Sequence, residues 1–148
     1  MLLKEGSGVA GQLDMVLEND LQEVARVLDR LELFCSDEGI MLQQGLRFCL
    51  ALDELITNIL SYGLAGRDDG VITLTVEHRN GALRAELADN GPHFDPLASE
   101  IDVPSDSIED RKLGGLGLTL VKAVMDRLDY RYADGFNRLD MEMKIQAA

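Results

Sequence analysis

Val71-Ile-Thr-Leu-Thr-Val-Glu-His78 and Leu83-Arg-Ala-Glu-Leu-Ala88 decide the fold class, because together they read as a β-hairpin. The first segment is rich in β-branched residues, and the second alternates apolar and polar side chains, as strands with one buried face do. Between them stands Asn80-Gly81, a dipeptide typical of two-residue hairpin turns. We therefore predict a hairpin, with Asp89 at the end of its second strand.

The segment before this hairpin predicts one strand and two helices. Residues 11–18 read as a strand, and Asn19 or Asp20 as the cap of a following helix. Its apolar residues recur at helical spacing: Leu21, Val24, Leu28, Leu31 and Cys35. After a break at Gly39, a second helix is predicted over about 41–62, and its buried stripe comprises Leu52, Leu55, Ile56, Ile59 and Leu60.

The segment after the hairpin predicts one more helix and two strands. The helix follows a glycine-rich turn, with Leu118, Val121, Met125 and Leu128 on its apolar face. Residues 129–133 and 138–145 read as strands around the turn Asp134-Gly135. Because strands and helices do not alternate regularly, we predict an α+β fold: a two-layer sandwich with helices on one face of a mixed, mostly antiparallel sheet.

Length and composition narrow the class of protein. The 148 residues, 46% of them hydrophobic, fit one domain over 1–148, in which the acidic segment 97–113 reads as a loop. A formal net charge of -13 disfavours nucleic acid and anionic lipid as partners. Neither a membrane span nor a secretory signal is recognisable, so we expect a cytoplasmic protein without a membrane partner. Cys35 and Cys49 read as reduced core thiols.

The first candidate motif lies on the second predicted helix. Glu54 and Asn58 are four residues apart, so they project from one helical face, away from the apolar stripe. A carboxylate there can accept a proton from a hydroxyl, and an amide oxygen is a neutral ligand suited to magnesium. Taken alone, the pair fits a solvated helix face better.

The second candidate motif follows the hairpin. The carboxylate of Asp89 can accept a hydrogen bond from an amino group such as that of adenine, and Gly91 lets the backbone approach a flat ligand. An ordinary Asx turn is the simpler interpretation of this segment alone. We expect Phe94 to anchor the loop in the core.

The third candidate motif is Gly114-Gly-Leu-Gly-Leu-Thr-Leu-Val121, preceded by Lys112. Glycines at the start of a helix let phosphate approach the free N–H groups and the positive end of the helix dipole. The spacing of the glycines matches neither a P-loop nor a dinucleotide-binding turn. A flexible entry into the helix explains the segment equally well.

In this order along the chain, the three motifs resemble the N, G1 and G2 boxes of the histidine-kinase-like, or Bergerat-fold, ATPases. The Gly-Gly-Leu-Gly-Leu phrasing and the Asp95-Pro96 pair look most like the anti-sigma regulatory factor serine/threonine kinases. Two positions depart from the family pattern: His93 stands where a second glycine is frequent, and Tyr62 where many relatives have histidine.

The resemblance implies an ATP- and magnesium-dependent protein-serine kinase. Glu54 would be the general base, Asn58 the magnesium ligand, Asp89 the adenine-reading carboxylate, Gly91 the close-approach residue, and 97–113 the lid. The phosphate side of the site would comprise Lys112, Gly114, Gly115, Leu116, Gly117 and Leu118.

The implied partners are an anti-sigma-factor antagonist as substrate and a sigma factor or similar regulator that the kinase sequesters. A nucleotide-gated binding module without kinase activity, a simple ATPase, and a homodimer all stay open. Val27 and Phe34 would then belong either to a docking surface or to the core.

Overall fold

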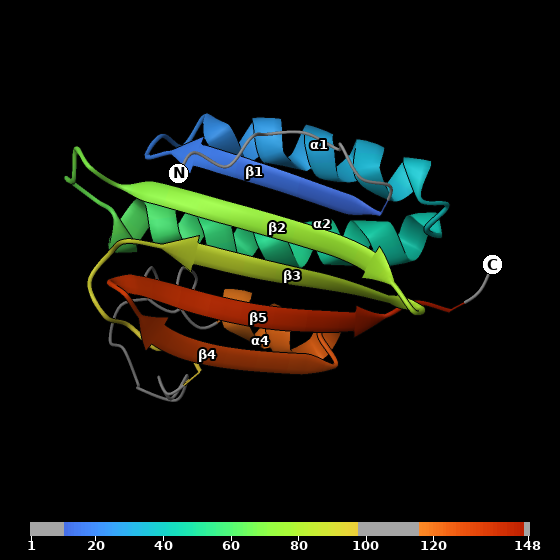
Figure 1. The fold of residues 1–148 in the computed structure, drawn as a ribbon. Coiled ribbons are helices and arrows are strands. Elements are labelled where there is room, and N and C mark those ends of the chain that lie inside the picture. Colours follow the sequence, from blue (N-terminus) through green and yellow to red (C-terminus); the bar gives the residue numbers. More distant parts are fainter. Residues whose placement is uncertain (1–10, 98–115, 147–148) are drawn as a thin grey trace.

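A five-stranded antiparallel sheet is the framework of the computed structural model, which describes residues 11–97 and 116–146. The strands lie in the order β1-β2-β3-β5-β4 (Figure 1). Every pair of neighbours is antiparallel, so the predicted sheet is confirmed without any parallel pair among the described strands. The strands are β1 (Gln12–Glu18), β2 (Val71–Arg79), β3 (Ala82–Asp89), β4 (Arg127–Ala133) and β5 (Phe136–Lys144).

Both predicted hairpin turns are present, and backbone conformation explains their sequences. Asn80 and Gly81 join β2 to β3 with φ angles of 53° and 73°. Asp134 and Gly135 join β4 to β5 with φ angles of 56° and 80°. Such left-handed conformations favour Asn, Asp and Gly, and paired in one turn they match the twist of the flanking strands.

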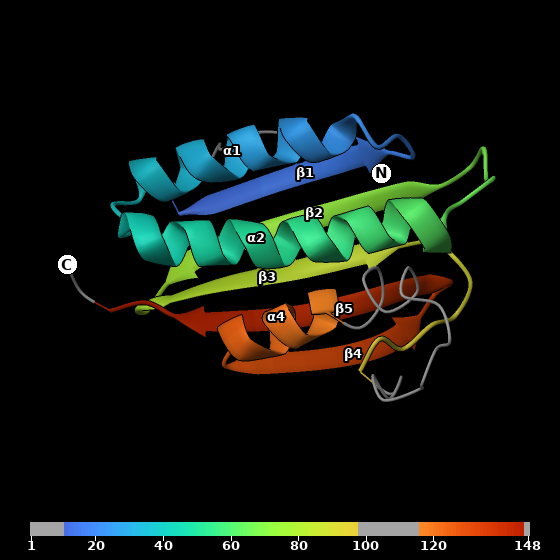
Figure 2. The same ribbon diagram turned by 180° about the vertical axis from the view of Figure 1, so that it is seen from behind.

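The helices cover one face of the sheet, as predicted (Figure 2). α1 lies over β1, α2 occupies the middle of the layer, and α4 lies over β5 and β4. A short π-helical segment, η1, continues α2 at its C-terminal end. The bounds are α1 (Glu23–Asp37), α2 (Leu42–Asn58), η1 (Ile59–Gly63) and α4 (Leu116–Val124).

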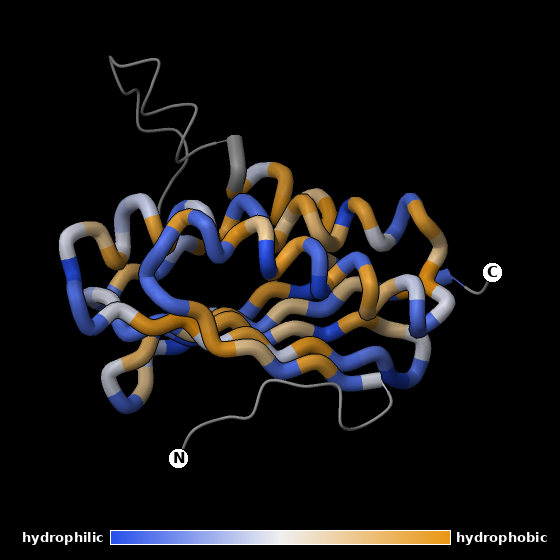
Figure 3. Tube along the Cα trace, turned by 90° about the horizontal axis from the view of Figure 1, so that it is seen from above, coloured by the Kyte–Doolittle hydropathy of each residue, from blue (hydrophilic) through white to orange (hydrophobic). Residues whose placement is uncertain are grey.

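The core fills the space between the two layers, because alternate strand residues face the helices. In β1 the inward residues are Leu13, Met15 and Leu17, and β2 and β3 continue these rows with the same period of two. Hydrophobic residues recur along the elements of both layers (Figure 3). From the helices, the predicted stripe of α2 is confirmed: Leu52, Leu55, Ile56 and Leu60 are buried, and Ile59 packs against them.

Helix α1 differs from its prediction at its start. Leu21 precedes the helix and is 57% exposed, so its expected place in the buried stripe was wrong. The N-cap of α1 is Gln22, without a side-chain cap bond, so the expected cap at Asn19 or Asp20 was wrong; the Asp20 carboxylate accepts the backbone N–H of Gln22 at 2.8 Å in the turn before the helix. Val27 and Phe34 are buried in the core and are therefore not available for docking.

The third helix is shorter than predicted. It ends at Val124, and β4 starts at Arg127, so Leu128 belongs to a strand and not to the helix. The backbone N–H of Asp126 donates to the carbonyl of Glu142 at 2.8 Å, which ties the chain to the sheet at this point. The apolar spacing of Leu128 was compatible with both periods, and pairing with β5 decides between them.

Two further expectations concern the cysteines and the membrane. Cys35 and Cys49 are buried and form no disulfide, which confirms that they are core thiols. Within the described ranges, no helix combines the length and the apolar character that crossing a bilayer requires. The predicted lid, apart from residue 97, lies outside the described residues.

Candidate functional site

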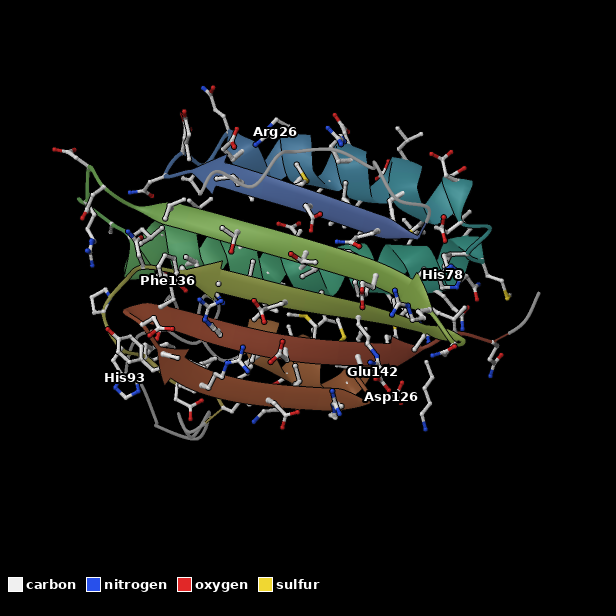
Figure 4. The ribbon with its side chains drawn as sticks, viewed as in Figure 1. Arg26, His78, His93, Asp126, Phe136 and Glu142 are labelled. Atoms are coloured by element: carbon white, nitrogen blue, oxygen red, sulfur yellow. The ribbon has the colours of Figure 1, made fainter. Side chains whose placement is uncertain are left out.

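A cavity of about 580 Å³ lies where β3 ends, β5 begins and α2 passes into η1. Its volume is in the range of small-molecule sites, and most of its wall is apolar. Figure 4 shows His93 and Phe136 at this end of the sheet, with His78 at the opposite end. The lining residues are Leu55, Asn58, Ile59, Tyr62, Gly63, Leu87, Asp89, Pro92, His93, Phe94, Pro96, Leu118, Tyr130, Asn137 and Leu139.

Strand register places two polar side chains in the wall of this cavity. In β3 the residues facing the helices alternate from Leu83 to Leu87, and the next residue in that row is Asp89. Asp89 pairs with Asn137 at the start of β5. Both are only 7% exposed, and among the described residues they are the buried polar or charged ones. The end of the sheet therefore presents a carboxylate and an amide to the cavity.

Asn137 holds the loop after β3 in place with both ends of its amide. Its Nδ2 donates to Asp89 Oδ1 at 3.1 Å and to the carbonyl of Pro92 at 2.9 Å, with a longer contact of 3.3 Å to the carbonyl of Gly91. Its Oδ1 accepts the backbone N–H of Phe94 at 3.0 Å and the hydroxyl of Tyr130 at 2.6 Å. One side chain thus connects the end of β3, the loop that follows it and β4.

The carboxylate of Asp89 is positioned before any ligand arrives. Its Oδ1 accepts the Gly91 backbone N–H at 2.9 Å as well as the Asn137 amide, so the predicted Asx-type turn is present. Among the described residues both bonds go to Oδ1, which leaves Oδ2 for an amino group of a ligand. Burial raises the pKa of Asp89, although the hydrogen bonds from Asn137 and Gly91 act in the opposite direction.

Gly91 is required by the protein's own packing. A Cβ at this position would lie 2.8 Å from Asp89 Oδ1 and 2.9 Å from the carbonyl oxygen of Gly63. Gly91 is not part of the cavity wall. The close approach seen here is therefore within the protein, whereas the predicted approach of Gly91 to a flat ligand stays a prediction.

The opposite wall is formed by the C-terminal end of α2 and by η1. The wider turn of η1 closes with a hydrogen bond of 2.8 Å from the Leu64 N–H to the Ile59 carbonyl, five residues earlier. As a result Asn58, Ile59, Tyr62 and Gly63 all line the cavity. π-Helical turns of this kind are frequent at functional sites. Tyr62 is 56% exposed and lies at the rim.

Glu54 lies one helical turn before Asn58 on α2 and is not part of the cavity wall. Its side chain is half-buried. Neither Glu54 nor Asn58 has a side-chain hydrogen bond to another residue in the described part of the chain. The predicted base and metal ligand are therefore on the same helix face, with only Asn58 inside the cavity wall.

Aromatic side chains surround the mouth of the cavity. His93 stacks on Tyr130 with ring centroids 6.0 Å apart and is tilted against Tyr132 at 4.9 Å. Phe94 is 61% exposed, so its expected role as a core anchor was wrong. The backbone N–H of Phe94 anchors the loop through Asn137, which leaves the ring at the cavity surface. The mouth thus offers flat apolar faces.

The third motif is only partly described. Leu118 is buried and lines the cavity, so α4 meets the other two motifs at one place. Leu116 and Gly117 form the first turn of α4. Lys112, Gly114 and Gly115 lie outside the described residues, so their part in phosphate binding stays a prediction.

Sequence reasoning missed Asn137 and Tyr130. A signal for Asn137 exists, because folding the last two strands about Asp134-Gly135 and pairing them with the first hairpin brings it opposite Asp89. That pairing is a tertiary arrangement that the local sequence does not specify. Burial, with a smaller contribution from the carboxylate of Asp95, raises the pKa of the Tyr130 phenol, which stays protonated and donates to Asn137.

Comparisons with known proteins find relatives that align with a little over half of the chain. The chain is 34% identical over 98 residues to serine/threonine-protein kinase BtrW of Bordetella bronchiseptica, an alignment that covers 65% of this chain and 69% of BtrW. It is 33% identical over 90 residues to serine-protein kinase RsbW of Listeria monocytogenes, covering 58% and 57%. It is 31% identical over 78 residues to an anti-sigma F factor of Clostridium botulinum, covering 53% and 54%. The chain thus spans a little over half the length of the latter two.

A solved structure confirms the fold at low sequence identity. The crystal structure of the RsbU and RsbW domains of Rv1364c from Mycobacterium tuberculosis matches with a TM-score of 0.67 and 15% identity, over 93% of this chain and 33% of that one. The sequence model of one protein family, the histidine kinase-like ATPase domain, matches residues 17–143. The chain therefore belongs to the family of histidine kinase-like ATPase domains, and membership of this ATP-using family implies that it binds ATP.

Proposed function

We propose that the chain is an ATP-dependent protein-serine kinase of a partner-switching system. It phosphorylates a serine of a small anti-sigma-factor antagonist and sequesters a sigma factor or a similar regulator. The observation that carries the proposal is the convergence of Asn58, Asp89 and Leu118 on one cavity, with Glu54 one turn away on α2. The printed names of its relatives, serine-protein kinase and anti-sigma F factor, support the same function.

The strand side of the cavity is suited to the adenine ring. A free oxygen on Asp89 accepts the exocyclic amino group, while the apolar lining and the aromatic side chains at the mouth cover the faces of the ring. Asn137 and the Gly91 N–H hold the carboxylate in one orientation, so little conformational entropy is lost when adenine binds.

The helix side is suited to phosphate transfer. Glu54 accepts the proton of the substrate serine as the serine oxygen attacks the γ-phosphorus, and the bond to the β–γ bridging oxygen breaks to release ADP. A binding module without catalysis has no need for a carboxylate at this place. Positioning of the two reactants supplies most of the rate.

Magnesium fits the same wall. The amide oxygen of Asn58 is a hard neutral ligand, and magnesium uses few protein ligands together with waters and phosphate oxygens. The ion neutralises charge on the phosphates when it is bound. Its binding depends on Asn58 because this side chain lines the cavity one turn beyond Glu54.

Transfer of labelled phosphate tests the proposal. The chain is incubated with γ-labelled ATP, magnesium and candidate antagonist proteins, each also in a form with the acceptor serine changed to alanine. We expect label on the serine form alone. Nucleotide-dependent binding of an antagonist without transfer would contradict the kinase and leave a binding module, and steady phosphate release without any partner would indicate a simple ATPase.

A further inference from the structure

A row of exposed leucines on α2 leads to the proposed catalytic side chains. Leu42, Leu46 and Leu50 are 77%, 45% and 51% exposed, and each lies four residues after the last. Continued at the same spacing, the row reaches Glu54 and Asn58. Residues four apart form a ridge on a helix surface, and such ridges are what a partner's grooves accept.

The position of α2 leaves this ridge open. α2 is the central helix of its layer, with α1 on one side and α4 on the other, and its inner face packs on the sheet (Figure 2). The leucine row faces away from that core. Single exposed leucines are normal on a protein surface, but three in one row form an apolar patch, which marks an interaction site.

Distance along the helix connects the patch with the chemistry. At about 1.5 Å per residue, Glu54 lies about 6 Å beyond Leu50 and about 12 Å beyond Leu46. Any protein whose serine reaches Glu54 must therefore cover the surface beside it. A patch that begins one turn from the base is in the right place to hold that protein.

Size and charge favour a substrate over a second copy of the chain. The patch comprises three leucines and the exposed Arg47 between them, whereas a stable interface uses about 20–30 residues a side. Two copies would each carry a formal net charge of -13 and repel one another. A small patch with one arginine suits a transient partner that offers an apolar face and an acidic group.

We propose that the protein substrate docks on Leu42, Leu46 and Leu50, with an acidic group of the substrate against Arg47, and that this contact brings its serine hydroxyl to Glu54. The proposal rests on the proposed kinase function, since it assigns the docking surface of the same reaction. The docking surface is separate from the nucleotide cavity, because none of these four residues lines that cavity.

Kinetics with a double variant test the docking surface. Leu46→Gln/Leu50→Gln removes the centre of the patch, and Leu21→Gln/Leu33→Gln is the matched control, since Leu21 and Leu33 are both 57% exposed and lie off the row. The probe is the antagonist that takes phosphate from the wild type. We expect the KM for the antagonist to rise about tenfold or more in the first variant only, with kcat and the Kd for ATP within about twofold.

Reversing the charge of Arg47 gives a second, independent test of the docking surface. Arg47→Glu should raise the KM for the antagonist, and the effect should shrink at high salt. Thermal melting of each variant checks that it is folded. A KM within twofold of wild type for Leu46→Gln/Leu50→Gln, or an equal rise in the control pair, would overturn the proposal.

Two other outcomes separate this proposal from the kinase function. If the wild type binds an antagonist without phosphorylating it, the variants are compared by Kd, and a selective loss keeps the docking surface while the kinase function fails. The docking proposal is overturned if no antagonist binds the wild type. It is also overturned if the wild type sediments as a dimer, and Leu46→Gln/Leu50→Gln, but not the control pair, dissociates this dimer without changing the KM for the antagonist.

Discussion

The two walls of the cavity differ in how firmly their polar side chains are held in place without a ligand. On the strand wall, Asp89 and Asn137 are buried and hydrogen-bonded to each other and to the loop between β3 and α4. On the helix wall, Glu54 and Asn58 are half-buried and make no side-chain hydrogen bond to another described residue. Asp89 and Asn137 therefore contribute to folding, whereas the side chains of Glu54 and Asn58 contribute little to stability. In the proposed function, the first pair recognises adenine and the second pair takes part in phosphate transfer.

This contrast has a physical reason. A buried polar group must be bonded within the protein, because leaving it unsatisfied costs about 1–3 kcal/mol. Recognition of one edge of a flat ring requires such a fixed and desolvated group. A general base and a metal ligand instead need access to a substrate and to water, so their environment stays partly open. Variants of the two walls should then change different measured quantities.

The largest expected effect is on catalysis, from the helix wall. Glu54→Gln removes the proton acceptor and should lower the rate of phosphate transfer by about 10²- to 10⁴-fold, with the Kd for ATP and the melting temperature nearly unchanged. Single-turnover transfer and nucleotide titration measure these quantities. Asp53→Asn is the matched control, because Asp53 is the preceding carboxylate and binds the Thr57 hydroxyl at 3.0 Å. Equal loss of ATP binding and transfer would contradict the role of Glu54.

The next effect is on stability, from the strand wall. Asn137→Ala removes one of the two hydrogen bonds that the described residues donate to the Asp89 carboxylate, and it leaves the Pro92 carbonyl and the Phe94 N–H without this partner. It should therefore lower the free energy of unfolding by about 2–3 kcal/mol. The same change on the helix wall, Asn58→Ala, should stay within about 0.5 kcal/mol. Urea denaturation without nucleotide measures both. Similar losses in the two variants would remove the distinction between the walls.

Asn58→Ala should also change how magnesium affects the thermal stabilisation of the protein by ATP. In the wild type, magnesium should increase the thermal stabilisation that ATP provides, since a ligand that binds only the folded state stabilises it by mass action. The variant should lose most of this magnesium-dependent part and keep the part due to ATP alone. An identical response to magnesium in both proteins would contradict Asn58 as the metal ligand.

Two glycines at the junction of the walls give a smaller effect. Gly91→Ala places a Cβ 2.8 Å from Asp89 Oδ1 and 2.9 Å from the Gly63 carbonyl, so it should destabilise the fold by about 2 kcal/mol. A Cβ at Gly63 would meet only the Cγ2 methyl of Ile59, at the ordinary contact distance of 3.9 Å, so Gly63→Ala serves as the control. Chemical denaturation compares the two. A smaller loss at 91 than at 63 would show that the loop after β3 relaxes freely.

The smallest expected effect has the opposite sign. Burial raises the pKa of Asp89 above its ordinary value of 3.8, so the ionised carboxylate destabilises the folded state at neutral pH. This penalty is absent below the unfolded pKa and grows as pH rises through the folded pKa. Asp89→Asn should therefore raise stability slightly at pH 7, and by less near pH 4. Melting curves from pH 4 to 8 measure the difference, and a gain that shrinks toward pH 8 would contradict the assignment.

The same contrast explains which parts of the site the sequence could predict. The boxes that contain Glu54, Asn58 and Asp89 are local patterns, each within one helix or at one strand end, and the structure places Asn58 and Asp89 in one cavity. The sequence did not predict Asn137 and Tyr130 as site residues, because they reach the site only when β5 pairs with β3. Phe94 was misjudged for a related reason: hydrophobicity favours burial, but Asn137 holds its backbone and leaves the ring at the cavity.

By itself, the sequence determined what depends on neighbours along the chain. Alternation with a period of two set the strands, apolar spacing of three and four set the helix faces, and Asn80-Gly81 and Asp134-Gly135 set the turns. Only the tertiary structure decided the strand order, the end of α4 at Val124, and the pairing of Asp89 with Asn137. Local patterns follow from the chemistry of a few adjacent residues, whereas these features depend on contacts between segments far apart, and no single segment encodes such contacts.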